Sequence, residues 1–465
     1  MSFISFEFIL FFIVLMLLYS LVRLEKHRQI LLLVSSYFFY GCADVRFLAI
    51  LIIISVIIWY IGLKSENYKS RGFYILGILI CLGVLGYFKY CNFFVESFAT
   101  LLRQQSSGTL QVILPLGISF YIFQAISYLC DVHWGKIAAE KEVWRVLLYV
   151  GFFPQITSGP IVKAKDFLPQ LQKEHRITWS YFSAGIQKAT IGLFKKVVIA
   201  DRLGVVVDAV YSAPKAYSGF SLLMAACSYA IQIYCDFSGY SDMAIGVAEI
   251  LGYDLGKNFE FPYIARNPSD FWRRWHISLS SWFRDYVYIP LGGNKKGKIR
   301  TFLNLFVTML LSGLWHGANW TFVIWGALHG GASVIHKVFC DIGKGGKTNQ
   351  SENMFGQIAS MIASIALVWL LWIPFRASTF SAAVLIISRI LIMAEGISYV
   401  SVFSIIYIIL IMFIQLYTFV AHDGKSWWKP LDFTRFWQVF LFSGFVMVIA
   451  IFAYIGDTAF IYAQF

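Results

Sequence analysis

The chain has 465 residues, of which 59% are hydrophobic and only 14% are charged. So few charges cannot cover the surface of a soluble protein, and the composition therefore indicates an integral membrane protein. The net charge of +13 would suggest a nucleic-acid partner for a soluble protein, but basic cytoplasmic loops explain it here, and no pattern typical of an RNA- or DNA-binding module is present.

Apolar runs long enough to cross a bilayer as helices recur along the chain, and the alternating pattern of barrel strands is absent. These runs include residues 4–22, 47–63, 72–88 and 358–372, and further spans are expected near 382–393, 402–420 and 437–455. We therefore predict an all-α, polytopic membrane protein with about 11 transmembrane or re-entrant helices.

The loops between the first spans predict the orientation of the chain. Basic residues follow the first and the third span: Arg23, Lys26, Arg28, Lys64, Lys69 and Arg71. The loop between them has only Asp44 and Arg46, so the positive-inside rule places the amino terminus outside the cytoplasm. The first run has no basic residues before it and no cleavage site after it, and we expect it to be a retained span.

Proline and glycine interrupt the middle of the chain. Pro115 and Gly117 break an apolar run, and residues 154–160 (PQITSGP) cannot form a continuous helix. This second break is either irregular backbone buried against protein or a surface turn, and the sequence leaves both interpretations open. Residues 163–180 are basic, and we expect them to be too charged for burial.

An apolar run at 221–234 leads into CDFSGYSD at 235–242. Two carboxylates, Asp236 and Asp242, flank Ser238 here. Paired acids can carry out general acid–base chemistry. The alternative is a polar pocket wall or a helix break, in which the carboxylates bond the backbone and basic neighbours, and we favour this structural interpretation.

Residues 267–330 hold the densest arginine and tryptophan usage. Asn267 is a helix cap, with proline directly behind it and an acid at the capping-box spacing. On the helix that follows, the spacing predicts that Trp272 and His276 share one face.

A second helix should carry His316 deep in an apolar span, with Asn319 and Trp320 on the same side. The apolar run before the histidine begins near Phe302, which at helical rise places His316 near mid-bilayer. Burying an ionisable residue at that depth costs free energy, so we hypothesise that His316 is a functional residue.

Other chemistries lack support in the sequence. No HExxH and no close cluster of histidines and carboxylates is present, so we predict no bound metal. No Gly-x-Ser-x-Gly elbow indicates a serine nucleophile. The segment 292–298 (GGNKKGK) lacks the ending of a phosphate loop, and we predict a basic cytoplasmic turn.

Four segments together resemble the membrane-bound O-acyltransferase family, and in particular its bacterial polysaccharide O-acetyltransferase branch. They are DFSGYSD (236–242), the FWRRWH region (267–293), SGLWHGAN (312–319) and SGPIVKAKDF (158–167). The resemblance implies one ring-like membrane domain, with N-terminal spans in 1–110, a catalytic core in 111–335 and C-terminal spans in 336–465.

The resemblance also implies an activity and a location. The branch moves an acyl group, usually acetyl, from a cytoplasmic thioester donor toward an extracytoplasmic polysaccharide, and commonly works with a separate extracytoplasmic acyl-transfer partner protein. The donor, acetyl-CoA or an acyl carrier protein, would be a substrate, and we expect no bound cofactor. A bacterial inner membrane, with its lipid around the spans, is the expected location.

Site residues follow from the matching positions. His316 falls on the family's invariant histidine and would be the base, and His276 falls on the second position, where it would orient the carbonyl, donate a proton or act as a relay. The candidates for substrate binding are Arg273, Arg274, Trp272, Trp315, Asn319, Asp236 and Ser238. The arginines would attract an anionic donor, although anchoring at the interface is the alternative for each. His329 and His336 are interpreted as structural.

Two other functions remain open. A transporter would also use broken helices and buried histidines, although the sequence has no inverted repeat. A related enzyme of the family could instead pass D-alanine to teichoic acid. The identity of the glycan does not follow from the sequence.

Overall fold

The computed structural model of the chain describes residues 1–67, 71–102, 112–343, 354–422, 429–454, 456 and 460, so Lys69 of the predicted basic loop lies outside the described residues. Within these ranges the chain is helical and contains no strand, which confirms the all-α prediction. A single isolated bridge pairs Tyr217 with Ile397.

The chain forms two compact units. Unit 1 consists of Met1–Leu193, Tyr240–Gly256 and Pro430–Val439, and unit 2 consists of Phe194–Gly239, Lys257–Lys429 and Phe440–Phe465. Two helices have residues in both units, namely α12 (Gly219–Ile250) and α20 (Phe436–Phe452).

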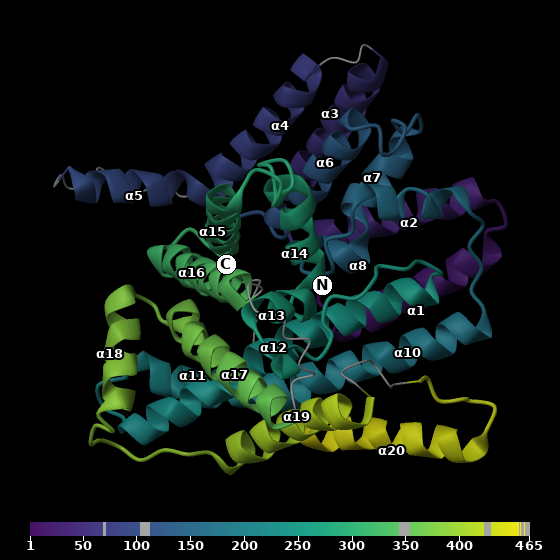
Figure 1. Cartoon of the computed structure of the whole chain (residues 1–465). Helices are drawn as coiled ribbons and strands as arrows, with labels where there is room; N and C mark the ends of the chain where they lie inside the picture. Colours follow the sequence, from purple (N-terminus) through teal and green to yellow (C-terminus); the bar gives the residue numbers. More distant parts are fainter. Residues whose placement is uncertain are drawn as a thin grey trace. The chain divides into compact units, whose positions relative to one another are not determined.

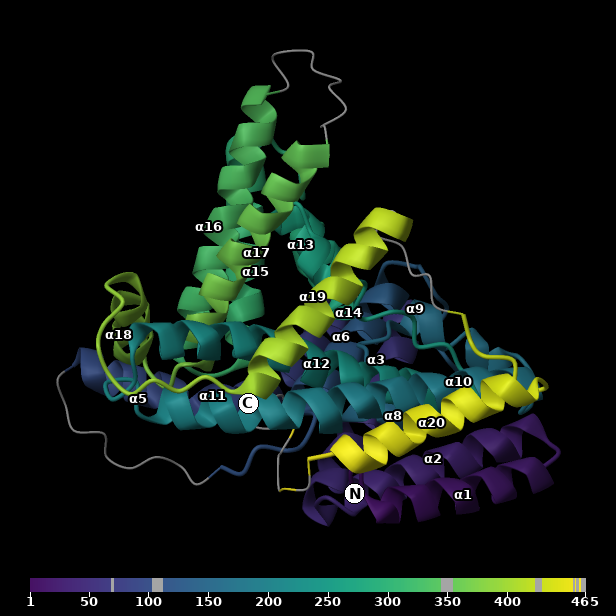
Figure 2. The same cartoon turned by 90° about the horizontal axis from the view of Figure 1, so that it is seen from below.

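The remaining helices, which Figures 1 and 2 label, belong to one unit each by their residue ranges. Those of unit 1 are α1 (Phe6–Leu21), α2 (Glu25–Gly41), α3 (Val45–Asn67), α4 (Arg71–Leu85), the π-helical η1 (Gly86–Tyr90), α5 (Cys91–Leu101), α6 (Ile118–His133), α7 (Val143–Gly151), α8 (Phe153–Ile156), α9 (Ala164–Phe167), η2 (Gln170–Gln172) and α10 (Trp179–Leu193). Those of unit 2 are the π-helical η3 (Phe194–Ala200), α11 (Asp201–Ser212), η4 (Pro262–Ile264), α13 (Pro268–Arg274), α14 (Ile277–Phe283), the π-helical η5 (Arg284–Tyr288), α15 (Lys298–His316), α16 (Trp320–Gly343), α17 (Met354–Arg376), α18 (Phe380–Leu391) and α19 (Val402–His422).

Several helices have the length and apolar composition of membrane spans. In the described ranges, five meet both criteria: Val45–Glu66, Arg71–Leu101, Gly219–Ile250, Met354–Arg376 and Val402–His422. Helices α1, α18 and α20 are apolar but shorter. A chain with several such helices is a multi-pass membrane protein, whereas the total of about 11 stays a prediction.

The predicted break at 154–160 is buried in unit 1. All of residues 153–162 are buried except Thr157, which is half-buried and whose hydroxyl hydrogen-bonds Tyr240. Gly117 lies against this segment in the left-handed region (φ 70°), where an added Cβ would run into the carbonyl oxygen of Ile156. The interpretation as irregular backbone packed against protein is therefore correct, and the surface turn is wrong.

The adjoining basic segment is also more buried than its charges suggested. Lys163 is only 6% exposed, and Phe167 and Leu171 are buried beside it. The expectation that residues 163–180 are too charged for burial is wrong for this first part, because the charged residues alternate with apolar ones that pack inward.

Helices α15 and α16 form the closest helix pair of unit 2. They lie side by side in both views (Figures 1 and 2), and α17 packs against α16. A Cβ on Gly326 would lie 2.6 Å from the carbonyl oxygen of Met309 and 2.9 Å from the Cα of Gly313. Glycine at both positions therefore allows the two backbones to approach closely.

Candidate functional site

The start of α13 matches the sequence prediction. The side chain of Asn267 accepts a hydrogen bond from the backbone N–H of Asp270 at 2.9 Å, and proline occupies the first helical position. The helix then ends at Arg274, sooner than the spacing suggested. Trp275 is extended, and His276 adopts the left-handed conformation with φ 43°.

The early end of α13 separates His276 from Trp272, so the prediction that they share a helical face is wrong. The cause is pairing with an earlier segment of the chain. The backbone N–H of Glu260 donates to the carbonyl of Arg274, and that of Ile277 donates to the carbonyl of Asn258, each at 2.9 Å. These backbone bonds hold the chain in a non-helical conformation after Arg274. Helix α14 then begins directly after His276.

His276 is fully buried in this turn. Its Nδ1 lies 3.1 Å from Oδ1 of Asn258, which also accepts a hydrogen bond from the hydroxyl of Ser278 at 2.8 Å. Because an amide oxygen only accepts, this contact favours the tautomer of His276 that is protonated at Nδ1. Phe237 packs edge-on against the imidazole, with ring centroids 4.6 Å apart.

His316 is the last residue of α15 and is 3% exposed. Its ring contacts those of Trp315, Trp325 and Phe375, at centroid distances of 5.1, 5.1 and 5.3 Å. The prediction that Asn319 and Trp320 continue the same helix is wrong, because Gly317 is extended and ends α15.

Asn319 lies at the start of the next helix. It is exposed, and its side-chain oxygen accepts a hydrogen bond from the backbone N–H of Thr321 at 2.9 Å, near the beginning of α16. This bond gives Asn319 a local structural role at a helix N-terminus.

Trp315 links the two histidines. Its ring lies 6.0 Å from that of His276 and 5.1 Å from that of His316. Trp272 reaches the same group of rings through Trp325, at 5.6 Å. The structure thus brings together Trp272, His276, Trp315 and His316, which the sequence singled out separately.

The two arginines of α13 differ in their surroundings. Arg273 is exposed. Arg274 is partly buried, and its guanidinium donates to Asp270 at 3.1 Å and to the carbonyl of Glu260 at 3.3 Å. Arg274 therefore anchors the helix end, and Arg273 is the better placed of the two to meet a charged group from solution.

The CDFSGYSD segment lies inside α12, so the predicted helix break is wrong. Asp236 is buried and forms an ion pair with Lys196 at 2.6 Å, and Lys196 also pairs with Asp201 at 2.8 Å. All three side chains are at most 5% exposed. Ser238 is 1% exposed on the same helix. Asp236 thus has the basic neighbour that the structural interpretation requires.

Sequence reasoning missed three residues around the site: Asn258, Lys196 and His329. The first two become neighbours of the site only through folding, because they are 18 and 40 positions from their partners. The sequence did contain an indication of His329, because it follows Trp325 by four positions on a helix and so lies on the same face. No group of three or more histidine, cysteine or acidic side chains in the described ranges is arranged to hold a metal ion.

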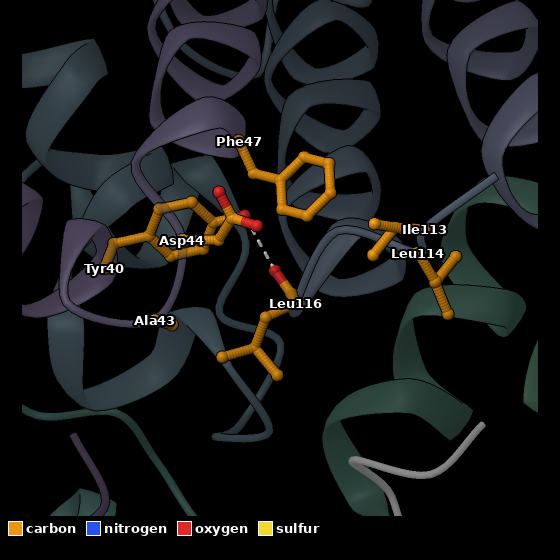
Figure 3. A pocket seen from close by; sticks show the side chains of 7 residues that line it. All are labelled: Tyr40, Ala43, Asp44, Phe47, Ile113, Leu114 and Leu116. Carbon is orange, nitrogen blue, oxygen red and sulfur yellow. Dashed lines mark hydrogen bonds between the residues drawn. The ribbon is translucent and has the colours of Figure 1, made fainter. Parts of the chain in front are cut away.

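A separate pocket lies in unit 1 and contains none of the predicted site residues (Figure 3). Its volume is about 260 Å³, and its lining residues are Tyr40, Ala43, Asp44, Phe47, Ile113, Leu114 and Leu116. The Tyr40 hydroxyl donates to the carbonyl of Leu116 at 2.9 Å. Hydrogen bonds from Arg46 hold the pKa of Asp44 below its usual value, so the only acidic side chain of the lining is ionised and paired.

The sequence of the chain is similar to those of known proteins from one family. Residues 142–364 match the model of the membrane-bound O-acyltransferase family. The chain is 44% identical to a probable alginate O-acetylase AlgI of Pseudomonas putida over 314 residues, which are 66% of this chain and 64% of the relative. The protein of the same name from Pseudomonas aeruginosa is 39% identical over 368 residues, 77% and 69% of the two chains.

A peptidoglycan O-acetyltransferase of Helicobacter pylori is 36% identical over 382 residues, which are 76% of this chain and 71% of the relative. The chain thus matches only 64% of the length of the Pseudomonas putida relative, and more of the other two. The matched region includes α13 to α16, where both histidines lie. The chain belongs to the membrane-bound O-acyltransferase family.

Proposed function

We propose that this protein is a membrane O-acyltransferase that moves an acetyl group from a thioester donor for the O-acetylation of an extracytoplasmic polysaccharide. The relatives named as alginate O-acetylase and peptidoglycan O-acetyltransferase support both the acetyl group and a glycan acceptor. The donor, acetyl-CoA or an acetylated carrier protein, is a substrate on this proposal, and no resident cofactor takes part.

The observation that carries the proposal is the pair of buried histidines on either side of Trp315. In the proposed reaction a hydroxyl oxygen of the molecule that first receives the acetyl group, which is the separate acyl-transfer protein, attacks the carbonyl carbon of the thioester, and His316 takes the hydroxyl proton. The carbon–sulfur bond then breaks, and the thiol leaves with that proton. Asn258 engages the Nδ1 of His276 and leaves its Nε2 to position the reacting group.

Orientation and partners complete the proposal. Arg23 between α1 and α2, and Lys26 and Arg28 in the first turn of α2, support a cytoplasmic position for this connection and an amino terminus outside a bacterial inner membrane. The donor then enters from the cytoplasm past exposed Arg273. A separate extracytoplasmic acyl-transfer protein receives the acetyl group and passes it to the polysaccharide.

The test is the His316→Ala variant, with His336→Ala as the matched control. His336 lies on α16, and its ring is near the thiol of Cys340, outside the aromatic cluster. We expect His316→Ala to abolish acetylation of the glycan in cells and acetyl transfer by the purified protein, while its thermal stability stays near wild type. A stable His316→Ala protein that acetylates at the wild-type rate would refute the assignment.

A further inference from the structure

Beyond His316, the cluster continues into rings that the proposed mechanism does not use. Trp325 and His329 lie one helical turn apart on α16, with ring centroids separated by 4.7 Å. Trp272 packs against both, at 5.6 and 5.0 Å, and Trp372 stacks on Trp325 at 5.7 Å. Trp325 therefore contacts His316 on one side and His329 on the other.

One ring nitrogen of Trp325 and one of His329 are buried without a hydrogen-bond partner among the described residues. Trp325 is 0% exposed and His329 is 1% exposed. No atom among the described residues accepts from the indole Nε1 of Trp325 or bonds the imidazole Nε2 of His329. A buried polar group that makes no hydrogen bond costs about 1–3 kcal/mol. A ligand that accepts hydrogen bonds from both nitrogens would remove that cost.

Their position beside the base indicates what they bind. The acceptor hydroxyl that His316 deprotonates must lie within bonding distance of the thioester carbonyl, so the carbonyl oxygen lies close to the base during reaction. That oxygen gains negative charge when the hydroxyl attacks, and buried N–H donors are the groups that stabilise such charge most effectively.

We infer that the indole N–H of Trp325 and the Nε2–H of His329 are hydrogen-bond donors to the carbonyl oxygen of the acyl thioester. This inference rests on the proposed function and assigns two further catalytic residues to it. When the oxygen–carbon bond forms, the π electrons of the carbonyl move onto its oxygen, where the two donors hold the charge. They return when the carbon–sulfur bond breaks and the thiol leaves, so the donors undergo no net change.

Removing single donors tests the inference. Trp325→Phe and His329→Phe delete one N–H each and keep an aromatic ring, and His329→Gln keeps a donor. The matched control is Trp369→Phe, because the indole nitrogen of Trp369 is also buried and unbonded in the described chain, but its ring packs on Tyr263. The assay is acetyl transfer from acetyl-CoA by purified protein, with thermal unfolding measured in parallel.

We expect Trp325→Phe and His329→Phe each to lower kcat about 10²-fold, with little change in the KM for the donor. His329→Gln should restore at least about a tenth of the wild-type kcat, and Trp369→Phe should be as active as wild type. The unfolding temperature of His329→Phe should stay near the wild-type value, because Nε2 makes no hydrogen bond among the described residues and an aromatic ring is kept. A purely structural role would leave kcat unchanged in the stable variants.

Two results separate failure of the inference from failure of the proposed function. If wild type and Trp369→Phe transfer acetyl and stable His329→Phe matches them, the inference is wrong and the function stands. If wild type transfers no acyl group, the proposed function itself is wrong. Should Trp325→Phe fail to fold, the contrast between His329→Phe and His329→Gln decides.

Discussion

The buried ion cluster of Lys196, Asp201 and Asp236 makes a quantitative prediction about stability. The variant Lys196→Met keeps an unbranched side chain of nearly the same length and removes the cation that pairs with both carboxylates. Both ion pairs are short, at 2.8 and 2.6 Å, and none of the three side chains is more than 5% exposed. Breaking a buried pair in this way costs about 3–5 kcal/mol, because an uncompensated charge is left inside the protein.

We expect the loss of stability in Lys196→Met to come from the unbalanced charge of the two carboxylates, not from the loss of the ion pairs themselves. In the triple variant Lys196→Met, Asp201→Asn, Asp236→Asn, the shapes are kept and every charge is removed. Replacing a whole buried ion cluster is often nearly neutral, so the triple variant should regain most of the lost stability. Lys188→Met is the control, since its pair with Glu249 is about 30% exposed and worth at most about 1 kcal/mol.

The assay is unfolding by sodium dodecyl sulfate in mixed micelles, followed by circular dichroism, for wild type and the three variants. The reasoning is refuted if Lys196→Met unfolds with the wild-type free energy. It is also refuted if the neutral triple variant is no more stable than Lys196→Met, because the charges would then not be the cause.

Three further predictions concern the site, the topology and the helix packing. His276→Ala should lower the transfer rate less than His316→Ala, for which we expect a loss of about 10²–10⁴-fold, and rates of both single variants and the double variant check this. A cysteine at exposed Asn294 should resist an impermeant thiol reagent in intact cells, because its basic turn is expected in the cytoplasm. Gly326→Ala should destabilise the protein by about 1–3 kcal/mol because its Cβ would meet α15. Gly331→Ala on the same helix has open space and should stabilise it by about 0.5–1 kcal/mol.

Each of these has an outcome that contradicts it. A more damaging His276→Ala would exchange the roles of the two histidines. Ready labelling at position 294 in an active protein would overturn that part of the topology. Equal unfolding free energies for the two glycine variants would mean that close backbone contact between α15 and α16 at Gly326 does not contribute to stability.

The sequence predicted the helices well and their ends poorly. Hydropathy alone located α1, α3, α4 and α17 to within a few residues, because burial in lipid needs a long apolar run whatever its partners. The end of α13 depends on backbone bonds to residues 258 and 260, which no local pattern reveals.

Residues of the candidate site could be named from the sequence where they lie in one motif, but the contacts between motifs could not be predicted. His276 and His316 could be named from their settings, but their common contact with Trp315 needs α15 to lie beside the turn after α13. His329 was interpreted as structural because a lone histidine on an apolar helix usually is. Its neighbours Trp272 and Trp325 come from different helices, so only the folded chain shows the cluster.

The π-helical segment η3 has a consequence for how this chain aligns with others. Lys196 and Asp201 are five positions apart, which on an α-helix would place them about 140° apart around the axis. The wider turn of a π-helix, with bonds from each residue to the fifth along, brings such residues onto one face. A homologous helix with one residue fewer could keep the same contact with the lysine and the acid four positions apart. A single-residue gap at this point of an alignment would therefore mark conservation of the ion pair, not its loss.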